Sequence, residues 1–325
     1  MNFSWLAFFC LGLFVYLFFS YLFAVLVNFK YHDGYNSEDV NYPRSRPDWV
    51  PADAFLIDMH AHTMASDGLL TPRQLIQWEI ANGYDGVVVS DHNTTKGVLA
   101  CQEAAAEIAP WFVVIPGTEY TSLNIHLNLI GVRTPFPSPN LVWTTRKTLQ
   151  KVIDHAHREG GVVQFNHKSW YFYDVLKKFP RQWLADQGID GWEVYNGFGF
   201  IDEEALEFIQ QQRDRKIMFA GAGTDVHDPA KHHRMYTAVL SNERSVEGVM
   251  KALKEGKTMV YYDPAKPMPR PEKGKLILNP DKSAFIKRWA WLGWAGLTLM
   301  WGTHRRLLIA FVVTVVALGV LMSLF

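Results

Sequence analysis

The chain has 325 residues, 49% of them hydrophobic and 14% aromatic, which is enough for one domain of about 200 to 250 residues with flanking segments. Its 32 basic and 32 acidic side chains cancel, and this excludes the global positive field that drives nonspecific binding to nucleic acid or anionic membranes. With only two cysteines, the sequence has neither a disulfide framework nor a thiolate metal site.

The N-terminal segment is apolar. Residues 3–29 contain no charged side chain, and a helix of about 20 residues already crosses a bilayer core of about 30 Å. A signal peptide would need a basic start, a short apolar core and a small-residue cleavage site, and none of these is present. The sequence therefore predicts an uncleaved transmembrane anchor in residues 1–30, followed by a polar linker in 31–53 that contains three prolines.

The C-terminal segment is also apolar. A proline-rich linker in residues 263–284 leads to a hydrophobic region in 285–325, where two uncharged stretches flank a basic pair. The stretch 307–325 is long enough to span a bilayer, whereas 289–303, with four tryptophans, spans or lies at the interface. We expect a transmembrane hairpin in an integral membrane protein, with the lipid bilayer as a partner. More lysines and arginines flank the middle domain than the opposite side, which favours a cytoplasmic middle domain.

Residues 54–262 alternate short β-rich runs with helical stretches, which predicts one α/β domain. Several runs are apolar on both faces, as expected for buried parallel strands. The predicted strands are 54–58, 86–90, 111–117, 126–131, 161–165, 191–195, 217–223 and 236–240. The predicted helices are 72–82, 95–109, 142–159, 203–213 and 245–255. Repeated strand-helix units over about 210 residues favour a barrel-like arrangement.

Two histidines stand where the first predicted strand ends. His60 and His62 are two residues apart, so both point to the same side of a strand and together can hold one metal ion. Asp67 follows in a glycine-ended loop. Two histidines on a solvated strand face explain this stretch equally well when it is considered alone.

The same pattern recurs at the ends of the other predicted strands. The further candidate ligands are His92, Glu119, His126, His167, Asp225 and His227. The carboxyl ends of barrel strands meet on one face, where clustered imidazoles and carboxylates would repel or remain desolvated without a cation. Nitrogen and oxygen ligands without thiolates favour Zn²⁺, Mn²⁺ or Fe²⁺.

In this order, the motifs HAH, SDG, SDH, GTE, H, NH and GTDVH resemble those of the PHP family, the polymerase and histidinol phosphatase domain. The resemblance covers about residues 54–262 and implies a distorted (β/α)7 barrel with two or three divalent metal ions (Mn²⁺, Zn²⁺ or Fe²⁺, with Mg²⁺ as an alternative). It implies one site of His60, His62, Glu119 and Asp225, a second of Asp67, His92 and His227, and a third in which Glu119 joins His126 and His167. Asp67 stands where the family often has histidine, and Lys168 where it commonly has proline.

The resemblance implies hydrolysis of a phosphomonoester or phosphodiester by a metal-activated hydroxide. We expect Asp67 or His227 to protonate the leaving oxygen, and Lys168 and Arg234 to contact the phosphate; Lys96 and Lys231 are nearby in the sequence but are equally compatible with solvated charges. The expected partner is a small phosphorylated substrate. A nucleotide, an oligonucleotide end, a sugar phosphate, an amino-alcohol phosphate and a lipid phosphate are all compatible with the sequence. No stable nucleic-acid partner is expected, because the chain lacks a basic stripe.

Other interpretations remain open at this point. Glu193, in a stretch that resembles a family signature, either supports the site or is a buried structural acid. His155 and His157 are interpreted as surface or packing residues, and His232 and His233 as loop residues. A metal-dependent amidohydrolase also begins with HxH, and a catalytically inactive, membrane-tethered metal-binding module would carry the same ligands. A polymerase-associated proofreading exonuclease is disfavoured, because the chain has no polymerase region.

Overall fold

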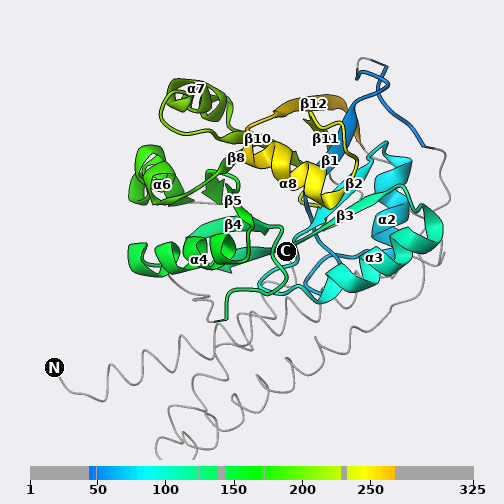
Figure 1. Ribbon diagram of the computed structural model, residues 1–325, viewed down its shortest axis with the longest axis horizontal. Helices are drawn as coiled ribbons and strands as arrows, with labels where there is room; N and C mark the ends of the chain where they lie inside the picture. The colour runs from blue at the N-terminus through cyan, green and yellow to red at the C-terminus, as the bar shows by residue number, and fades with distance from the viewer. Residues whose placement is uncertain are drawn as a thin grey trace, which may run out of the picture. The chain divides into compact units, whose positions relative to one another are not determined.

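The computed structural model describes residues 44–48, 50–122, 124–137, 144–170, 173–227 and 233–267 (Figure 1). The predicted anchor in 1–30 and the predicted hairpin in 285–325 lie outside these residues. Within the described part of the chain, no helix combines the length and the apolar character that a bilayer crossing requires.

A mixed sheet forms the centre of the domain, and all eight strands predicted from the sequence are present in it. Its order is β10-β8-β5-β4-β3-β2-β1-β11-β12, and β9 pairs with β8. The strands are β1 (Phe55–Ala61), β2 (Gly86–Val89), β3 (Val113–Ser122), β4 (Ile125–Ile130), β5 (Val162–Phe165), β8 (Gly191–Asn196), β9 (Phe200–Ile201), β10 (Phe219–Gly223), β11 (His233–Val239) and β12 (Thr258–Pro267). A separate hairpin consists of β6 (Ser169–Trp170) and β7 (Tyr173–Asp174).

The sheet curls into an incomplete barrel. The segment after β10 returns to β1, where the Asp225 amide donates to the His60 carbonyl at 2.6 Å and the His62 amide donates to the Val226 carbonyl at 3.3 Å. Seven strands, β1 to β5 with β8 and β10, therefore surround the interior, while β11 and β12 extend the sheet from the other side of β1.

The expectation of parallel strands needs one correction. Strand β4 runs antiparallel to both β3 and β5, and β11 runs antiparallel to β1. Only the two residues 123 and 124 separate β3 from β4, and a connection that short joins antiparallel strands, since a parallel pair needs a long crossover. The reversal places the start of β4 beside the end of β3.

Helices cover the outside of the curled sheet (Figure 1). They are α2 (Pro72–Ala81), α3 (Lys96–Ile108), α4 (Arg146–Arg158), α5 (Val175–Lys178), α6 (Arg181–Gln187) and α7 (Glu203–Gln212), whereas α8 (Val246–Lys254) packs against the inner apolar cluster. Helix α2 begins with a capping box, in which the Thr71 side chain accepts from the Gln74 amide and the Gln74 side chain accepts from the Thr71 amide. Helix α4 begins at Arg146 rather than at residue 142, because Thr145 caps it.

Three apolar clusters fill the domain. One packs α2 and α3 against β1, β2 and β3, and another packs α4, α6 and α7 against β4, β5 and β8. The third joins inward-facing residues of most strands to α8, and includes Ile57, Met59 and Phe219. These apolar residues and α8 occupy the interior, which leaves the carboxyl ends of the strands for polar side chains.

The described domain extends into both segments predicted as linkers. Arg44 and Arg46, in the segment predicted as a linker, form ion pairs with the buried carboxylate of Asp85. Strand β12 continues to Pro267, five residues past the predicted boundary at 262. Residues 44–48 and 263–267 therefore belong to the described domain.

Candidate metal centre

A bulge in β1 turns His60 and His62 toward the interior. Ile57 and Met59 face the inner apolar cluster, so a regular strand would place His60 on the outer face. The β1–β2 register shifts between Asp58 and Ala61, which inserts one extra residue and reverses the alternation. Both histidines consequently lie inside the barrel, and both are fully buried.

Glu119, near the end of β3, lies at the centre of the site. Its Oε1 is 3.2 Å from His126 Nδ1 and 3.4 Å from His60 Nε2, and its Oε2 is 2.7 Å from His92 Nδ1. His126 reaches the carboxylate because β4 is antiparallel and begins at this end of the barrel. One carboxylate therefore contacts imidazoles from three other segments.

The side chains of the first ligand group that the resemblance implied lie close together. The Nε2 atoms of His60 and His62 lie 3.0 Å apart. Asp225 Oδ1 is 3.2 Å from the first of these nitrogens and 3.0 Å from the second. Asp225 is held there in the left-handed backbone region, with φ of 54°. Its carboxylate and the two imidazoles can therefore share one cation.

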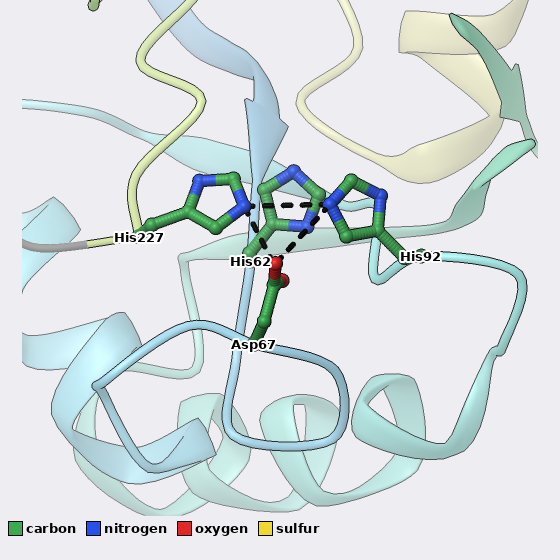
Figure 2. Close-up of side chains that lie close together, drawn as sticks. All are labelled: His62, Asp67, His92 and His227. Atoms are coloured by element: carbon green, nitrogen blue, oxygen red, sulfur yellow. Dashed lines mark hydrogen bonds and ion pairs between the residues drawn. The ribbon is translucent and has the colours of Figure 1, made fainter. Parts of the chain in front are cut away.

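The second group is shown in Figure 2. Asp67 Oδ1 lies 3.2 Å from His227 Nε2, its Oδ2 lies 3.5 Å from His92 Nε2, and these two nitrogens are 3.4 Å apart. His62, assigned by the resemblance to the first group only, also has a ligand atom within 4.8 Å of all three. Asp67 is half exposed, whereas His92 and His227 are about one quarter exposed. This group forms the accessible side of the centre.

The third group consists of Glu119, His126 and His167. Their ligand atoms lie within 4.8 Å of one another, and all three residues are buried. Glu119 Oε1 is 3.8 Å from His167 Nε2. The structure thus brings together all nine side chains that the sequence suggested as ligands.

The donor atoms fit divalent cations. Imidazole nitrogens that face each other at 3.0 to 3.4 Å repel one another unless a proton or a cation lies between them. Ligands of one Zn²⁺ bind at about 2.0 to 2.2 Å, which requires mutual spacings of about this size. His62 Nδ1 and His167 Nδ1 are buried without a hydrogen-bond partner among the described residues. The nitrogen and carboxylate set matches Zn²⁺, Mn²⁺ or Fe²⁺.

The site keeps its carboxylates ionised. Burial alone would raise the pKa of Glu119, but His126, His60 and His92 hold that pKa well below its usual range. Burial would also raise the pKa of Asp225, but His60 and His62 help to keep that pKa well below its usual range. Burial, together with His227 and His92, lowers the pKa of His62 to about 3, so this imidazole is neutral at pH 7. Anionic carboxylates and a neutral imidazole are the forms that bind metals.

Supporting residues complete the centre. Glu193 Oε1 accepts from His60 Nδ1 at 2.8 Å, which leaves His60 Nε2 for a metal, and Glu193 Oε2 accepts from the His167 amide at 2.9 Å. Asn166 donates to Glu119 Oε1 at 2.8 Å. Asn196 donates to Asp225 Oδ2 at 3.1 Å. Of these, the sequence indicated only Glu193, and the structure supports its role behind the ligands; the two asparagines follow no motif that would reveal them.

Substitution Glu193→Gln is expected to weaken metal binding about tenfold. Both carboxylate oxygens accept hydrogen bonds, and a glutamine amide would turn a donor toward either His60 or the His167 amide. The metal content after dialysis against graded metal concentrations measures the effect. Glu203→Gln, at an exposed acid on α7, is the control, and equal metal affinity in both variants would contradict the orienting role.

The metal-free protein is expected to lose stability as the pH rises from about 6.5 to about 9. Burial lowers the pKa of His227, but Asp67 and Asp225 outweigh it and raise that pKa to about 9 from 6.5. A raised histidine pKa stabilises the fold fully below the unfolded value, and this contribution is lost as the pH passes the folded value. His60 and His92 shift in the same direction.

Melting temperatures measured with chelator and with saturating Mn²⁺ across this pH range check the prediction. The chelated protein should melt lower at pH 9 than at pH 6.5, whereas the metal-loaded protein should show a smaller change, because the metal replaces the protons. A melting temperature of the chelated protein that rises over this range would contradict it.

Lys168 and Arg234, the two residues expected to contact the phosphate, lie in different environments. Lys168 Nζ lies 3.5 Å from Asp202 and 3.4 Å from Glu204, directly after His167. Arg234 is buried, with 8% of its surface exposed. Lys96 begins α3, and Lys231 and His232 lie outside the described residues.

His155 and His157 lie on the outside of the domain, where His155 contacts the Thr134 carbonyl and His157 contacts Asp190, as expected for packing residues.

Comparisons with known proteins agree with this fold. A solved two-domain protein from Bacteroides vulgatus, described as containing a predicted PHP-like metal-dependent phosphoesterase, superposes with a TM-score of 0.53 over 70% of each chain at 21% identity. The chain shares this PHP-like fold. Of the expected distorted (β/α)7 barrel, the α/β class and the PHP-like arrangement of the sheet are therefore supported, and the barrel itself is incomplete.

The relatives found by sequence match a smaller part of this chain. The 5'-3' exoribonuclease Rnm of Salmonella typhimurium is 31% identical and that of Escherichia coli 28% identical, each over 42% of this chain and 61% of the relative. The chain thus spans about three fifths of the length of these curated relatives. No family model matches the sequence.

Proposed function

We propose that the chain is a PHP-family enzyme that hydrolyses phosphate esters with divalent metal ions held by the nine clustered side chains. One observation carries the proposal: Glu119 contacts imidazoles of His60, His92 and His126, and so joins all three ligand groups. A shared carboxylate between ligand groups is suited to ions a few ångströms apart, as in two-metal phosphoesterases.

Bound ions would supply an activated water and would neutralise phosphoryl charge. The chain's own residues fix where this happens. Glu119 and Asp225 remain ionised, and Glu193 fixes the orientation of His60. Asp67, His92 and His227 are the accessible members of the set, and Asp67 Oδ1 lies 3.2 Å from His227 Nε2. We propose that Asp67 or His227 delivers the proton to the leaving oxygen.

The substrate is proposed to be a phosphomonoester or phosphodiester. The prediction that excluded a nucleic-acid partner gains no support, because both Rnm relatives are named as 5'-3' exoribonucleases. A phosphodiester at the 5' end of RNA is therefore the second candidate substrate. The neutral overall charge of the chain favours short substrates over long ones, since long strands are held by basic grooves.

A panel of phosphomonoesters, phosphodiesters and 5'-phosphorylated RNA, assayed with Mn²⁺, Zn²⁺, Fe²⁺ and Mg²⁺, tests the function. Purified full chain should hydrolyse at least one class, and His60→Ala should not. His157→Ala, on the outside of α4, is the matched control. Equal turnover by wild type and His60→Ala would refute the site, and turnover of amides or lactones alone would favour an amidohydrolase. Metal binding without any turnover would favour the inactive module.

We also propose that residues 1–30 and 285–325 anchor the domain on the cytoplasmic side of a membrane. Their uncharged stretches carry this proposal. The protein should remain in the membrane pellet after alkaline washing, and a protease added outside intact cells should leave the domain uncut. Release by the wash would contradict anchoring.

A further inference from the structure

Two phenylalanines from one hairpin lie against two of the ligand groups. The hairpin joins β8 to β9 and has the sequence NGFGFI over residues 196–201. The Phe198 ring centroid is 5.8 Å from that of His227, and the Phe200 ring centroid is 5.7 Å from that of His167. Phe198 is 46% exposed. An accessible aromatic ring thus borders the accessible side of the centre.

The hairpin is fixed to the centre itself. Asn196 Nδ2 donates to Glu193 and to Asp225, and Asn196 Oδ1 accepts from the Phe198 amide at 3.0 Å. The Gly197 amide donates to the Gly223 carbonyl, and a Cβ at residue 197 would lie 2.0 Å from the Thr224 carbonyl oxygen. The same contacts that hold Asp225 therefore fix the backbone that presents Phe198.

A flat aromatic ring beside a phosphate site suits a flat ligand. Each nucleobase has a π face, so base–aromatic stacking binds any base and does not require hydrogen bonds to it. Single exposed apolar residues are common on proteins, but this ring contacts a candidate metal ligand and is held by the ligand network. A sugar phosphate or glycerol phosphate has no ring of this kind to place on it.

We propose that Phe198 stacks against the base of the nucleotide whose phosphate reaches the metal centre, so that the site selects nucleotides over base-free phosphate esters. This inference rests on the proposed phosphoesterase function. Phe198 acts on substrate position and not on the reacting atoms, so its removal should raise KM much more than it lowers kcat.

The test uses two matched substrate pairs with the Mn²⁺-loaded full chain. One pair is adenosine 5'-monophosphate and ribose 5-phosphate, and the other is a 5'-phosphorylated diadenylate with and without its first base. Phe198→Ala should raise KM about tenfold or more for the base-containing member of the pair that is hydrolysed, and less than twofold for the other. Phe198→Trp should restore the wild-type KM, which excludes misfolding as the cause.

Trp111→Ala is the control, because Trp111 is 47% exposed and precedes β3 at the opposite end of the barrel. Equal effects of Phe198→Ala on both members of a pair would overturn the inference and leave the function standing. If wild type hydrolyses neither pair, calorimetric binding of adenosine 5'-monophosphate decides: tenfold weaker binding by Phe198→Ala supports stacking, and unchanged binding or no binding by wild type overturns it.

Discussion

Substitution Glu119→Gln is expected to lower kcat/KM for phosphate-ester hydrolysis at least about 10³-fold. The carboxylate contacts His60, His92 and His126, so the neutral amide weakens all three ligand groups at once. It also turns an N–H donor toward imidazole nitrogens that need an acceptor or a metal. Metal content per chain, measured on the same sample, should fall together with activity.

Glu79→Gln is the matched control for this substitution. Glu79 is also fully buried, but it lies on α2, and burial together with Asp58 raises its pKa well above the usual range. Glutamine has the same shape as this side chain, and Glu79 belongs to none of the three ligand groups. Activity within about twofold of wild type is expected for this control. If Glu119→Gln kept activity within tenfold of wild type, Glu119 would not be the shared ligand.

Substitution Asp91→Asn is expected to lower kcat/KM about 100-fold without removing a ligand. The buried Asp91 carboxylate accepts from the Thr63 amide at 2.8 Å, from the Thr63 hydroxyl at 2.7 Å and from the Ser66 hydroxyl at 2.7 Å. An asparagine amide cannot accept on both sides, so the loop that carries Asp67 loosens. The free energy of unfolding should fall by about 2 kcal/mol.

Metal content separates this effect from that of a ligand substitution. The variant should lose the ion held by the Asp67 group and retain those near Glu119, so its content should decrease by one ion per chain. Ser66→Ala, which removes one of the three hydrogen bonds, should have a smaller effect in the same direction. An Asp91→Asn variant with wild-type activity would show that the loop holds Asp67 without this anchor.

The strand pattern was predictable because apolar runs and their turn residues are local signals. The antiparallel direction of β4 was not predicted. His126 lies at the start of this strand, and it can reach ligands at the carboxyl ends of the other strands only if β4 runs in the opposite direction. The candidate ligands still meet at one end of the barrel, as expected, because the antiparallel direction of β4 places its start beside the carboxyl ends of β3 and β5. Helices α5 and α6 were missed, since each is a single turn or two.

The site was predictable as a set of residue types and not as a geometry. Strand-end histidines and acids identify the ligands, but the bulge that turns His60 and His62 inward depends on tertiary contacts. Asp58, beside the bulge, accepts from the Thr224 amide at 2.9 Å across 166 residues of sequence. The segment after β10 that returns to β1 also brings His227 close to His62 and Phe198. The sharing of His62 between two ligand groups and the contact of Phe198 with His227 therefore depend on the tertiary fold.

Metal-dependent recovery of activity tests the central claim most directly. Full chain stripped by a chelator should show no phosphate-ester hydrolysis, and stepwise addition of Mn²⁺ should restore it to a plateau at two or three ions per chain. His60→Ala should bind fewer ions and should not recover. Stripped protein that hydrolyses the ester as fast as the metal-loaded protein would contradict the assignment of the nine residues as a catalytic metal centre.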